Sequence, residues 1–320
     1  MDGLHPEVRR LWDEFRARGI VPADPQVQDL ATARAAARRY HAHLSPDRPA
    51  VALVEDVVAP APGRSVPIRL FRPDRRGELP VLVYFHGGGF VLNGIDTHDR
   101  LLRLLARRTG MAVAAVTYRL APEHRFPAPL EDALTAIAWL RAEGGARGLD
   151  AARLAVAGDS AGANLALAVT LALRDRGLPL PDAGLLFYGM FSADLDTPSH
   201  HAYGDGRFGL TTARMEWFWR QYLADPAQCG NPLAAPLGAD LAGLPPQVVV
   251  GAGVDCLLDD SRNLAAALRA AGTPVAFALA ARLPHSFLQL TAFVGAADTA
   301  LTDAALALQA VWPTAERRAG

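Results

Sequence analysis

One serine stands where the chain can turn it into a nucleophile. Residues 158–162 read Gly-Asp-Ser-Ala-Gly, which matches the pattern G-x-S-x-G around Ser160. An apolar run that we expect to be a buried strand precedes the pattern, and an Ala- and Leu-rich stretch that we expect to be a helix follows it. A strand–serine–helix arrangement is a sharp turn that lifts the hydroxyl out at the strand's end. The pattern therefore predicts a nucleophilic serine, with a purely structural glycine turn as the alternative.

A glycine-rich loop offers hydrogen-bond donors for the same chemistry. The string His-Gly-Gly-Gly at residues 86–89 directly follows the apolar run at 81–85. Glycines let backbone N–H groups approach a substrate carbonyl with no Cβ in the way. Together with the N–H of Ala161, these groups are predicted to hold the oxyanion of a tetrahedral intermediate, and His86 is expected to fix the loop through a hydrogen bond. A phosphate-binding loop is excluded, because no lysine follows and the G-x-G-x-x-G spacing is missing.

A serine hydroxyl needs an adjacent base at neutral pH. His285 lies in an expected loop between the last strand and the last helix, which brings it to the same edge of the sheet as the serine. Asp255 directly follows the preceding strand, so its carboxylate is predicted to orient the histidine. Asp259 and Asp260 are the alternatives, and we expect them to cap the following helix instead.

The composition excludes several other classes of protein. Apolar residues make up 51% of the chain and charged residues 20%, which is typical of a globular protein. The net charge is −1, from 32 basic and 33 acidic residues, so we expect no binding to nucleic acid or to an anionic membrane. Every basic residue is arginine. The lack of lysine excludes Schiff-base chemistry, pyridoxal phosphate attachment and a Walker-type phosphate loop.

Cysteines and histidines give no sign of a metal or redox centre. Cys229 and Cys256 form no C-x-x-C pair, and a disulfide between them stays open as an alternative. The histidine pairs at 41/43 and 200/201 lack a third ligand at metal spacing, so no metal is expected. The first residues are polar, and the longest apolar run, residues 165–173, is too short to span a membrane. We expect a cytoplasmic protein.

From residue 80 onward, apolar runs alternate with helical stretches. Near-continuous apolar strands separated by helices indicate a mostly parallel sheet covered on both faces. The expected strands are Val81–Phe85, Met111–Thr117, Leu154–Ala157, Ala183–Tyr188, Gln247–Gly251 and Val275–Ala280. Before them, Val54–Val58 and Val66–Phe71 are expected to pair antiparallel across a turn rich in Pro and Gly.

Two stretches interrupt this alternation. Residues 1–45 are expected to be helical, with one helix that begins at Asp24-Pro25. Residues 190–230 contain a cluster of aromatic side chains at 217–222, most of which we expect in a local core. We interpret both stretches as one cap over the carboxyl edge of the sheet. Residues 46–189 and 231–320 would then form the catalytic α/β domain.

These motifs together resemble the bacterial hormone-sensitive-lipase-like family of α/β-hydrolase carboxylesterases. The resemblance runs from about Val54 to Trp312. It rests on the chain order Ser, Asp, His and on five strings, at 86–89, 118–124, 158–162, 255–259 and 284–287. It implies an eight-stranded, mostly parallel sheet flanked by helices, a helical cap, and catalysis without metal or cofactor. Ala163 and Cys256 depart from the family pattern, where glycine and proline are usual.

The resemblance also implies a role for individual residues. The implied site consists of Ser160 as nucleophile, Asp255 as acid and His285 as base, of Gly88, Gly89 and Ala161 as oxyanion donors with Gly87 as a close rival, and of Phe90, Tyr188 and Leu210 as candidates for the pocket wall. The implied substrate is a small-molecule ester of a short to medium acyl chain. Many members of the family are dimers, so a homodimer is an open expectation.

Two alternatives for function stay open at this level. An amidase or formamidase would use the same triad, and nothing in the sequence separates an amide substrate from an ester. A ligand receptor on the same fold is the third hypothesis, but such receptors lose a triad member and all three are present here. Around the site, Arg119 and Glu123 are expected to form an ion pair that braces the oxyanion loop.

Overall fold

The computed structural model describes residues 3–312, so the outermost parts of the predicted ranges, residues 1–2 and 313–320, lie outside the described residues. Its centre is an eight-stranded sheet with the strand order β1-β2-β4-β3-β5-β6-β7-β8. The strands are β1 (Leu53–Ala61), β2 (Arg64–Arg72), β3 (Leu79–Phe85), β4 (Ala112–Val116), β5 (Leu149–Asp159), β6 (Ala183–Phe187), β7 (Gln247–Val254) and β8 (Val275–Pro284). Only β2 runs antiparallel to its neighbours, β1 and β4. The expected mostly parallel sheet is confirmed.

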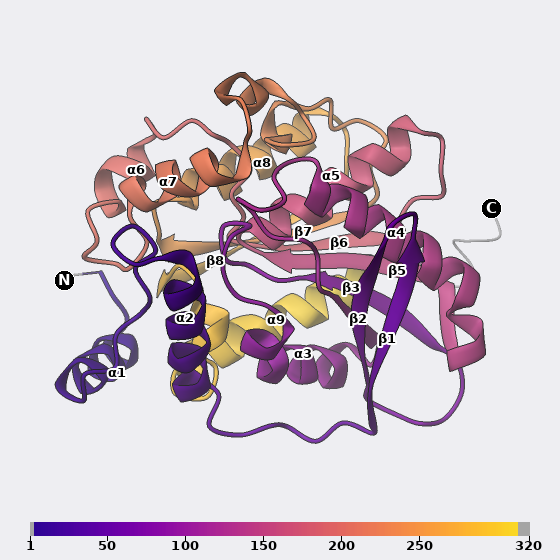
Figure 1. The fold of residues 1–320 in the computed structure, drawn as a ribbon, viewed down its shortest axis with the longest axis horizontal. Coiled ribbons are helices and arrows are strands. Elements are labelled where there is room, and N and C mark those ends of the chain that lie inside the picture. Colours follow the sequence, from indigo (N-terminus) through magenta and orange to yellow (C-terminus); the bar gives the residue numbers. More distant parts are fainter. Residues whose placement is uncertain (1–2, 313–320) are drawn as a thin grey trace.

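Helices cover both faces of this sheet. They are α1 (Pro6–Ala17), α2 (Leu30–Leu44), α3 (Ile95–Thr109), α4 (Ala128–Glu143), α5 (Ala161–Asp175), α6 (Pro198–Tyr203), α7 (Thr212–Tyr222), α8 (Leu258–Ala270) and α9 (Gly295–Val311). Helices α4, α5 and α8 pack on one face, and α3 and α9 pack on the other (Figure 1). Strand β3 faces both layers: Val83 joins the first core and Leu82 the second. This double burial explains the unbroken apolar runs in the sequence.

The N-terminal helices differ from the sequence expectation in one respect. Asp24-Pro25 starts no helix, because the Asp24 carboxylate accepts the Gln26 N–H at 3.0 Å in a local turn. Helix α2 begins five residues later, where Asp29 accepts the Thr32 N–H at 2.9 Å. A side-chain acceptor for an early helical N–H is what fixes a helix start.

Helices α1 and α2 lie on the same side of the molecule as α6 and α7 (Figure 1). Residues of α1, α2 and α7 share a pocket with Gly88, which follows β3, and with Ser160, which follows β5. These helices therefore stand over the carboxyl edge of the sheet. Tyr222 at the end of α7 is buried and stacks on Phe90, with ring centroids 3.8 Å apart, so α7 rests directly on the loop after β3.

The predicted ion pair between Arg119 and Glu123 is wrong. Arg119 instead bonds the buried carboxylate of Asp132, with its Nε 2.9 Å from Oδ2. Glu123 pairs with Arg34 of α2 at 2.7 and 2.8 Å. The same guanidinium donates to the Val91 carbonyl at 2.9 Å. Glu123 thus pairs with a residue 89 positions away and Arg119 with one 13 positions away, and Arg34 fastens α2 to the loop that follows β3.

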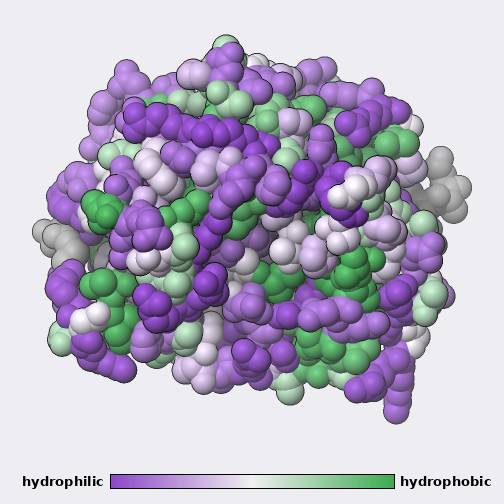
Figure 2. Space-filling model, in the orientation of Figure 1, coloured by the Kyte–Doolittle hydropathy of each residue, from purple (hydrophilic) through white to green (hydrophobic). Residues whose placement is uncertain are grey.

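The face of the protein shown in Figure 2 is mostly polar. On the face shown in Figure 2, hydrophilic side chains dominate and hydrophobic ones gather in smaller patches. Within residues 3–312, no helix combines the length and apolar character that crossing a bilayer requires. Cys229 is exposed and Cys256 is buried, and both are free, so the disulfide left open by the sequence does not form.

Candidate active site

Ser160 occupies the tight turn between β5 and α5. Its backbone has φ 55° and ψ −120°, a conformation that L-residues rarely adopt. Glycines on either side make the turn sterically feasible. A Cβ on Gly162 would overlap the carbonyl of Phe85, and one on Gly158 would overlap the carbonyl of Gly162. The G-x-S-x-G pattern is therefore required by close backbone contacts, and the strained turn presents the serine hydroxyl at the end of β5.

The three residues predicted as a triad form one hydrogen-bonded chain. The Nε2 atom of His285 lies 3.0 Å from the Oγ atom of Ser160, and its Nδ1 atom lies 2.7 Å from Oδ2 of Asp255. The Asp255 side chain is fully buried and that of His285 is 9% exposed. With the Nδ1 proton donated to the carboxylate, Nε2 is left free to accept the serine proton. This arrangement can perform nucleophilic attack on a carbonyl carbon.

Asp259 and Asp260, the alternative acids, serve another purpose. Asp260 accepts the N–H groups of Phe191 and Ser192 at 2.7 and 2.9 Å. Asp259 accepts the N–H of Ser199 at 2.8 Å. The expectation that they cap α8 is wrong, because both lie inside its first turn and fasten the segment after β6. Burial raises the pKa of Asp260 to about 8.

The backbone donors of the glycine loop are not equivalent. The Gly87 N–H donates to Oδ1 of Asp159 at 2.8 Å, which removes this rival from the predicted oxyanion donors. Within the described residues, the N–H groups of Gly88, Gly89 and Ala161 donate to no protein acceptor. Gly88 and Gly89 have φ values of 129° and 62°, and a Cβ on Gly89 would overlap the ring of Phe218. Glycine is thus needed for both conformation and space, and three donors are left for a substrate oxygen.

The Asp159 carboxylate is a brace that sequence reasoning missed. Besides the Gly87 N–H, it accepts the Tyr84 hydroxyl at 2.8 Å and lies 3.2 Å from Nε2 of His98. Burial alone would raise the pKa of this carboxyl group, but the adjacent His98 imidazole and the hydrogen bonds to Tyr84 and Gly87 outweigh burial and hold the pKa below its ordinary value. Only the identity of the residue before the serine could have given a signal.

His86 fixes the same loop from behind, as expected. Its Nδ1 atom contacts the Gly87 carbonyl at 2.9 Å, and its own carbonyl accepts the Tyr118 hydroxyl at 2.6 Å. The rings of His86 and Tyr118 stack with centroids 4.4 Å apart. Burial lowers the pKa of His86 to about 4, so the imidazole is neutral at pH 7.

Known proteins share both this sequence and this architecture. Residues 82–289 match a protein family whose description is 'alpha/beta hydrolase fold'. The chain is 39% identical over 264 residues to the Carboxylic ester hydrolase LipN of Mycobacterium tuberculosis, which covers 80% of this chain and 70% of that protein. The chain belongs to the hormone-sensitive-lipase-like family of α/β-hydrolase carboxylesterases. The resemblance stated from the sequence motifs is confirmed.

Two further comparisons agree with this carboxylesterase assignment. The Ethyl acetate hydrolase of Pseudomonas putida is 38% identical over 253 residues, which cover 77% of this chain and 79% of that protein. The solved structure of ester-hydrolase EH1AB1, from the metagenome of Lake Arreo, superposes with a TM-score of 0.90 at 37% identity. That match covers 97% of this chain and all of the other.

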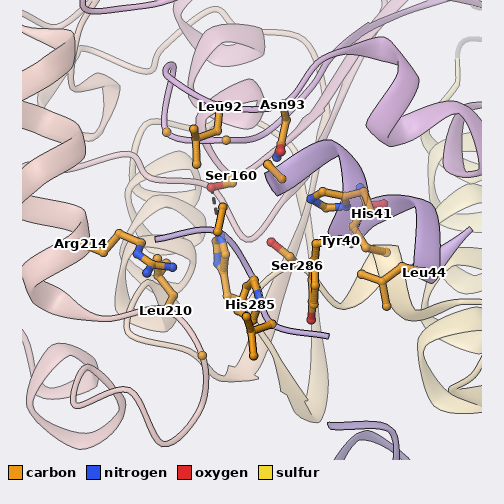
Figure 3. Close-up of a pocket in the computed structure, with 18 of the residues that line it drawn as sticks. Tyr40, His41, Leu44, Leu92, Asn93, Ser160, Leu210, Arg214, His285 and Ser286 are labelled. Atoms are coloured by element: carbon orange, nitrogen blue, oxygen red, sulfur yellow. Dashed lines mark hydrogen bonds between the residues drawn. The ribbon is translucent and has the colours of Figure 1, made fainter. Parts of the chain in front are cut away.

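A pocket of about 420 Å³ opens beside the serine of this carboxylesterase. Figure 3 shows Ser160 and His285 between two walls. One wall carries Tyr40, His41 and Leu44 of α2, which recur at helical spacing. The other carries Leu210 and Arg214 from the segment after β6. The N-terminal helices and the insertion thus both contribute to the space that a substrate would fill.

One of the three predicted pocket residues lies on the pocket wall and the other two lie behind it. Leu210 lines the pocket. Phe90 and Tyr188 do not, and both are fully buried. Phe90 stacks on Tyr222, and the ring of Tyr188 packs edge-on against His285 at 5.0 Å between centroids. Tyr188 therefore supports the imidazole, and Phe90 supports α7.

Helix α7 supplies wall residues, and one of them, Phe218, belongs to the aromatic cluster that the sequence predicts mainly in a local core. Met215 and Phe218 stand three positions apart, on one face of the helix, and both line the pocket. The helical spacing of Arg214, Met215 and Phe218, at positions i, i+1 and i+4, was the signal in the sequence that could have identified these wall residues. The described residues contain no group of three or more His, Cys, Asp or Glu side chains arranged to hold a metal ion.

Proposed function

We propose that this carboxylesterase hydrolyses small esters of short to medium acyl chains through an acyl-serine intermediate. His285 takes the proton of Ser160 as the hydroxyl oxygen attacks the ester carbonyl, and Asp255 stabilises the resulting imidazolium. The N–H groups of Gly88, Gly89 and Ala161 hold the oxyanion. The alcohol leaves with the proton from His285. A water molecule, activated by the same histidine, then releases the acid and restores the serine.

The observation that carries this proposal is the continuous chain Ser160–His285–Asp255, with contacts of 3.0 and 2.7 Å, on the wall of a pocket. Three unpaired N–H groups stand on the loop and helix beside it. A receptor on the same fold would not need this arrangement. The pocket volume of about 420 Å³ falls in the usual range of small-molecule sites.

The test is hydrolysis of p-nitrophenyl acetate, butyrate, octanoate and laurate by the wild type and by Ser160→Ala. We expect the highest kcat/KM on a short chain and a loss of about 10⁶-fold in kcat in the variant. Ser286→Ala is the matched control, because Ser286 is the other serine on the pocket wall and should retain most of the activity. Equal activity in wild type and Ser160→Ala would refute the mechanism. A higher kcat/KM on a matched anilide than on the ester would replace the esterase by an amidase.

A homodimer in the cytoplasm is also part of the proposal. Strand β8 is an unpaired edge of the sheet and exposes Leu279, and α9 exposes Leu306. An apolar sheet edge of this kind favours pairing with a second copy. The free cysteines agree with a reducing compartment. Light scattering at micromolar concentration tests the dimer, and fractionation of the source cells tests the location. A monomer or a secreted protein would contradict the respective part.

A further inference from the structure

Arg214 stands in an unfavourable place for a cation. It is the third residue of α7, and no acidic residue stands in the first turn of that helix. The N-terminal end of a helix carries a partial positive charge, which repels a guanidinium. The side chain nevertheless lines the pocket and points from α7 toward His285 (Figure 3). Such placement calls for a compensating negative charge, which the described protein supplies through one partly exposed ion pair.

The guanidinium of Arg214 has an N–H donor that no acceptor of the described protein satisfies. Its nearest acidic partner is Asp24, with 3.3 Å between Nη2 and Oδ1, and that carboxylate is 42% exposed. The Nε atom is buried without any hydrogen-bond partner. Among residues 3–312, no side-chain N–H of Arg214 donates a well-aligned hydrogen bond. A buried donor without an acceptor is costly, so a ligand acceptor at this point would be stabilised.

The other cations of the pocket wall are already satisfied. Arg16 bonds Asp13 at 3.1 Å, and Arg207 bonds Asp205 at 2.5 Å. All four of these side chains are about half exposed or more, so water screens them. Arg214, at 21% exposed, is far less solvated. It is therefore the arginine of the pocket wall that water screens least, and its charge interacts more strongly with a bound ligand than an exposed charge would.

The α2 wall opposite Arg214, formed by Tyr40, His41 and Leu44, carries no charge at pH 7. Burial lowers the pKa of His41 to about 3, so its imidazole is neutral at pH 7. The lining carboxylate, Asp159, accepts hydrogen bonds from Gly87 and Tyr84. Three arginines, Arg16, Arg207 and Arg214, thus line the described pocket against this one carboxylate, so the net charge of the lining is positive.

We propose that Arg214 binds a carboxylate carried by the substrate, so that the preferred esters are those with a second, anionic carboxyl group. The inference rests on the proposed function, because it names the substrate class of the same site. A planar guanidinium matches a carboxylate with two parallel N–H···O bonds. The carboxylate belongs either to the acyl part, as in a monoester of a dicarboxylic acid, or to the alcohol part.

Arg214 has a structural role that the test must separate from recognition. Its contact with Asp24 joins the N-terminal segment to α7, and the Gln26 side chain reinforces this link with a hydrogen bond of 3.4 Å to the Ala213 carbonyl. A purely structural link would affect every substrate alike. It would also be broken equally by removing either member of the Arg214–Asp24 pair.

The experiment compares kcat/KM for anionic and neutral esters of the same shape. The acyl arm uses mono-p-nitrophenyl glutarate and adipate against p-nitrophenyl pentanoate and hexanoate, with the spontaneous rate subtracted. The alcohol arm uses 4-carboxyphenyl acetate against 4-carbamoylphenyl acetate. The proteins are the wild type, Arg214→Gln, Arg214→Lys and Asp24→Asn. The control is Arg220→Gln, since Arg220 lies on the same helix but is 62% exposed and pairs with Glu216.

We expect Arg214→Gln to lose about 10- to 100-fold on the anionic ester of one arm and less than about 3-fold on its neutral partner. Arg214→Lys should recover part of the loss, and Asp24→Asn should keep or increase activity on the anionic ester. Equal losses on both esters, or an effect of Asp24→Asn that copies Arg214→Gln, would overturn the inference.

Two outcomes distinguish this inference from the proposed function. A wild type that hydrolyses neither ester of either arm would contradict the esterase mechanism itself. A wild type that hydrolyses the neutral esters, with no loss specific to anionic esters in Arg214→Gln, would leave the mechanism intact and overturn only the role of Arg214. If Arg214→Gln does not fold, Arg214→Lys and Asp24→Asn decide the question: equal effects on anionic and neutral esters overturn it.

Discussion

The buried carboxylate of Asp159 accepts the Gly87 N–H at 2.8 Å. Asp159 directly precedes Ser160, the proposed nucleophile, and Gly87 directly precedes Gly88, the first of the proposed oxyanion donors. One hydrogen bond therefore fixes the distance between the attacking oxygen and the groups that stabilise the charge it creates. A Cβ on Gly87 would lie 2.5 Å from the same carboxylate, so the glycine is as necessary as the acid.

Asp159→Asn should lower kcat by about 10- to 100-fold with little change in KM, because an amide keeps one acceptor oxygen and turns donors toward Tyr84 or His98. Steady-state kinetics on p-nitrophenyl butyrate measure kcat and KM, and a denaturant titration shows whether the variant is folded. Asp150→Asn on the same strand is the control, because Asp150 only makes a loose pair with Arg153 at 3.9 Å. Wild-type kcat in a folded Asp159→Asn protein would contradict the role of the brace.

Asp255→Asn should lower kcat by about 10⁴-fold, because an amide at this point favours the wrong tautomer of His285. Asp259→Asn is the matched control four residues on, since its carboxylate accepts the Ser199 N–H and does not contact the histidine. It should keep kcat within about tenfold. The assignment of the acid fails if the two variants lose activity to the same extent.

His41 should make the fold sensitive to acid. Burial lowers its folded-state pKa to about 3, whereas the unfolded chain binds this proton near its ordinary value of 6.5. The unfolded state thus holds more protons between about pH 3 and 6.5, and stability falls as the pH drops through this window. This proton binding makes the free energy of unfolding about 1–2 kcal/mol lower at pH 5 than at pH 7. His41→Gln should narrow the gap in unfolding free energy between pH 7 and pH 5, as measured by urea titration; an unchanged gap would exclude this histidine as the cause.

Phe218→Leu should shift the preferred acyl chain toward greater length. The ring of Phe218 lines the pocket against Gly89, and a smaller side chain opens space beside the serine. We expect the ratio of kcat/KM for octanoate over butyrate to rise by about tenfold. Trp217→Leu serves as control, because Trp217 is the neighbouring aromatic residue and does not line the pocket. A constant ratio would show that the acyl chain lies elsewhere.

The sequence was informative where local steric needs leave a pattern. The glycines around Ser160 are required by backbone contacts, and the positions of Asp255 and His285 follow from strands that end at one edge. Relations between distant side chains left no such pattern. Gly87 could be separated from Gly88 only by its contact with Asp159.

Charged residues were the least predictable part. Arg119 and Glu123 stand four positions apart, but each pairs with a residue brought close by the fold, Asp132 and Arg34. The start of α2 was misplaced for a related reason. Asp24-Pro25 and Asp29 are both reasonable helix starts, but Asp24 accepts the Gln26 N–H in a local turn and pairs with Arg214, whereas Asp29 accepts the Thr32 N–H and begins α2.

The central claim is that Ser160 forms the covalent intermediate, and covalent labelling tests it most directly. Diethyl p-nitrophenyl phosphate phosphorylates an activated serine with release of nitrophenolate. Intact-protein mass spectrometry should show one diethylphosphoryl group per active chain, and peptide mapping should place it on Ser160, in step with the loss of esterase activity. A label on any other residue, or full inactivation without a label on Ser160, would contradict the account.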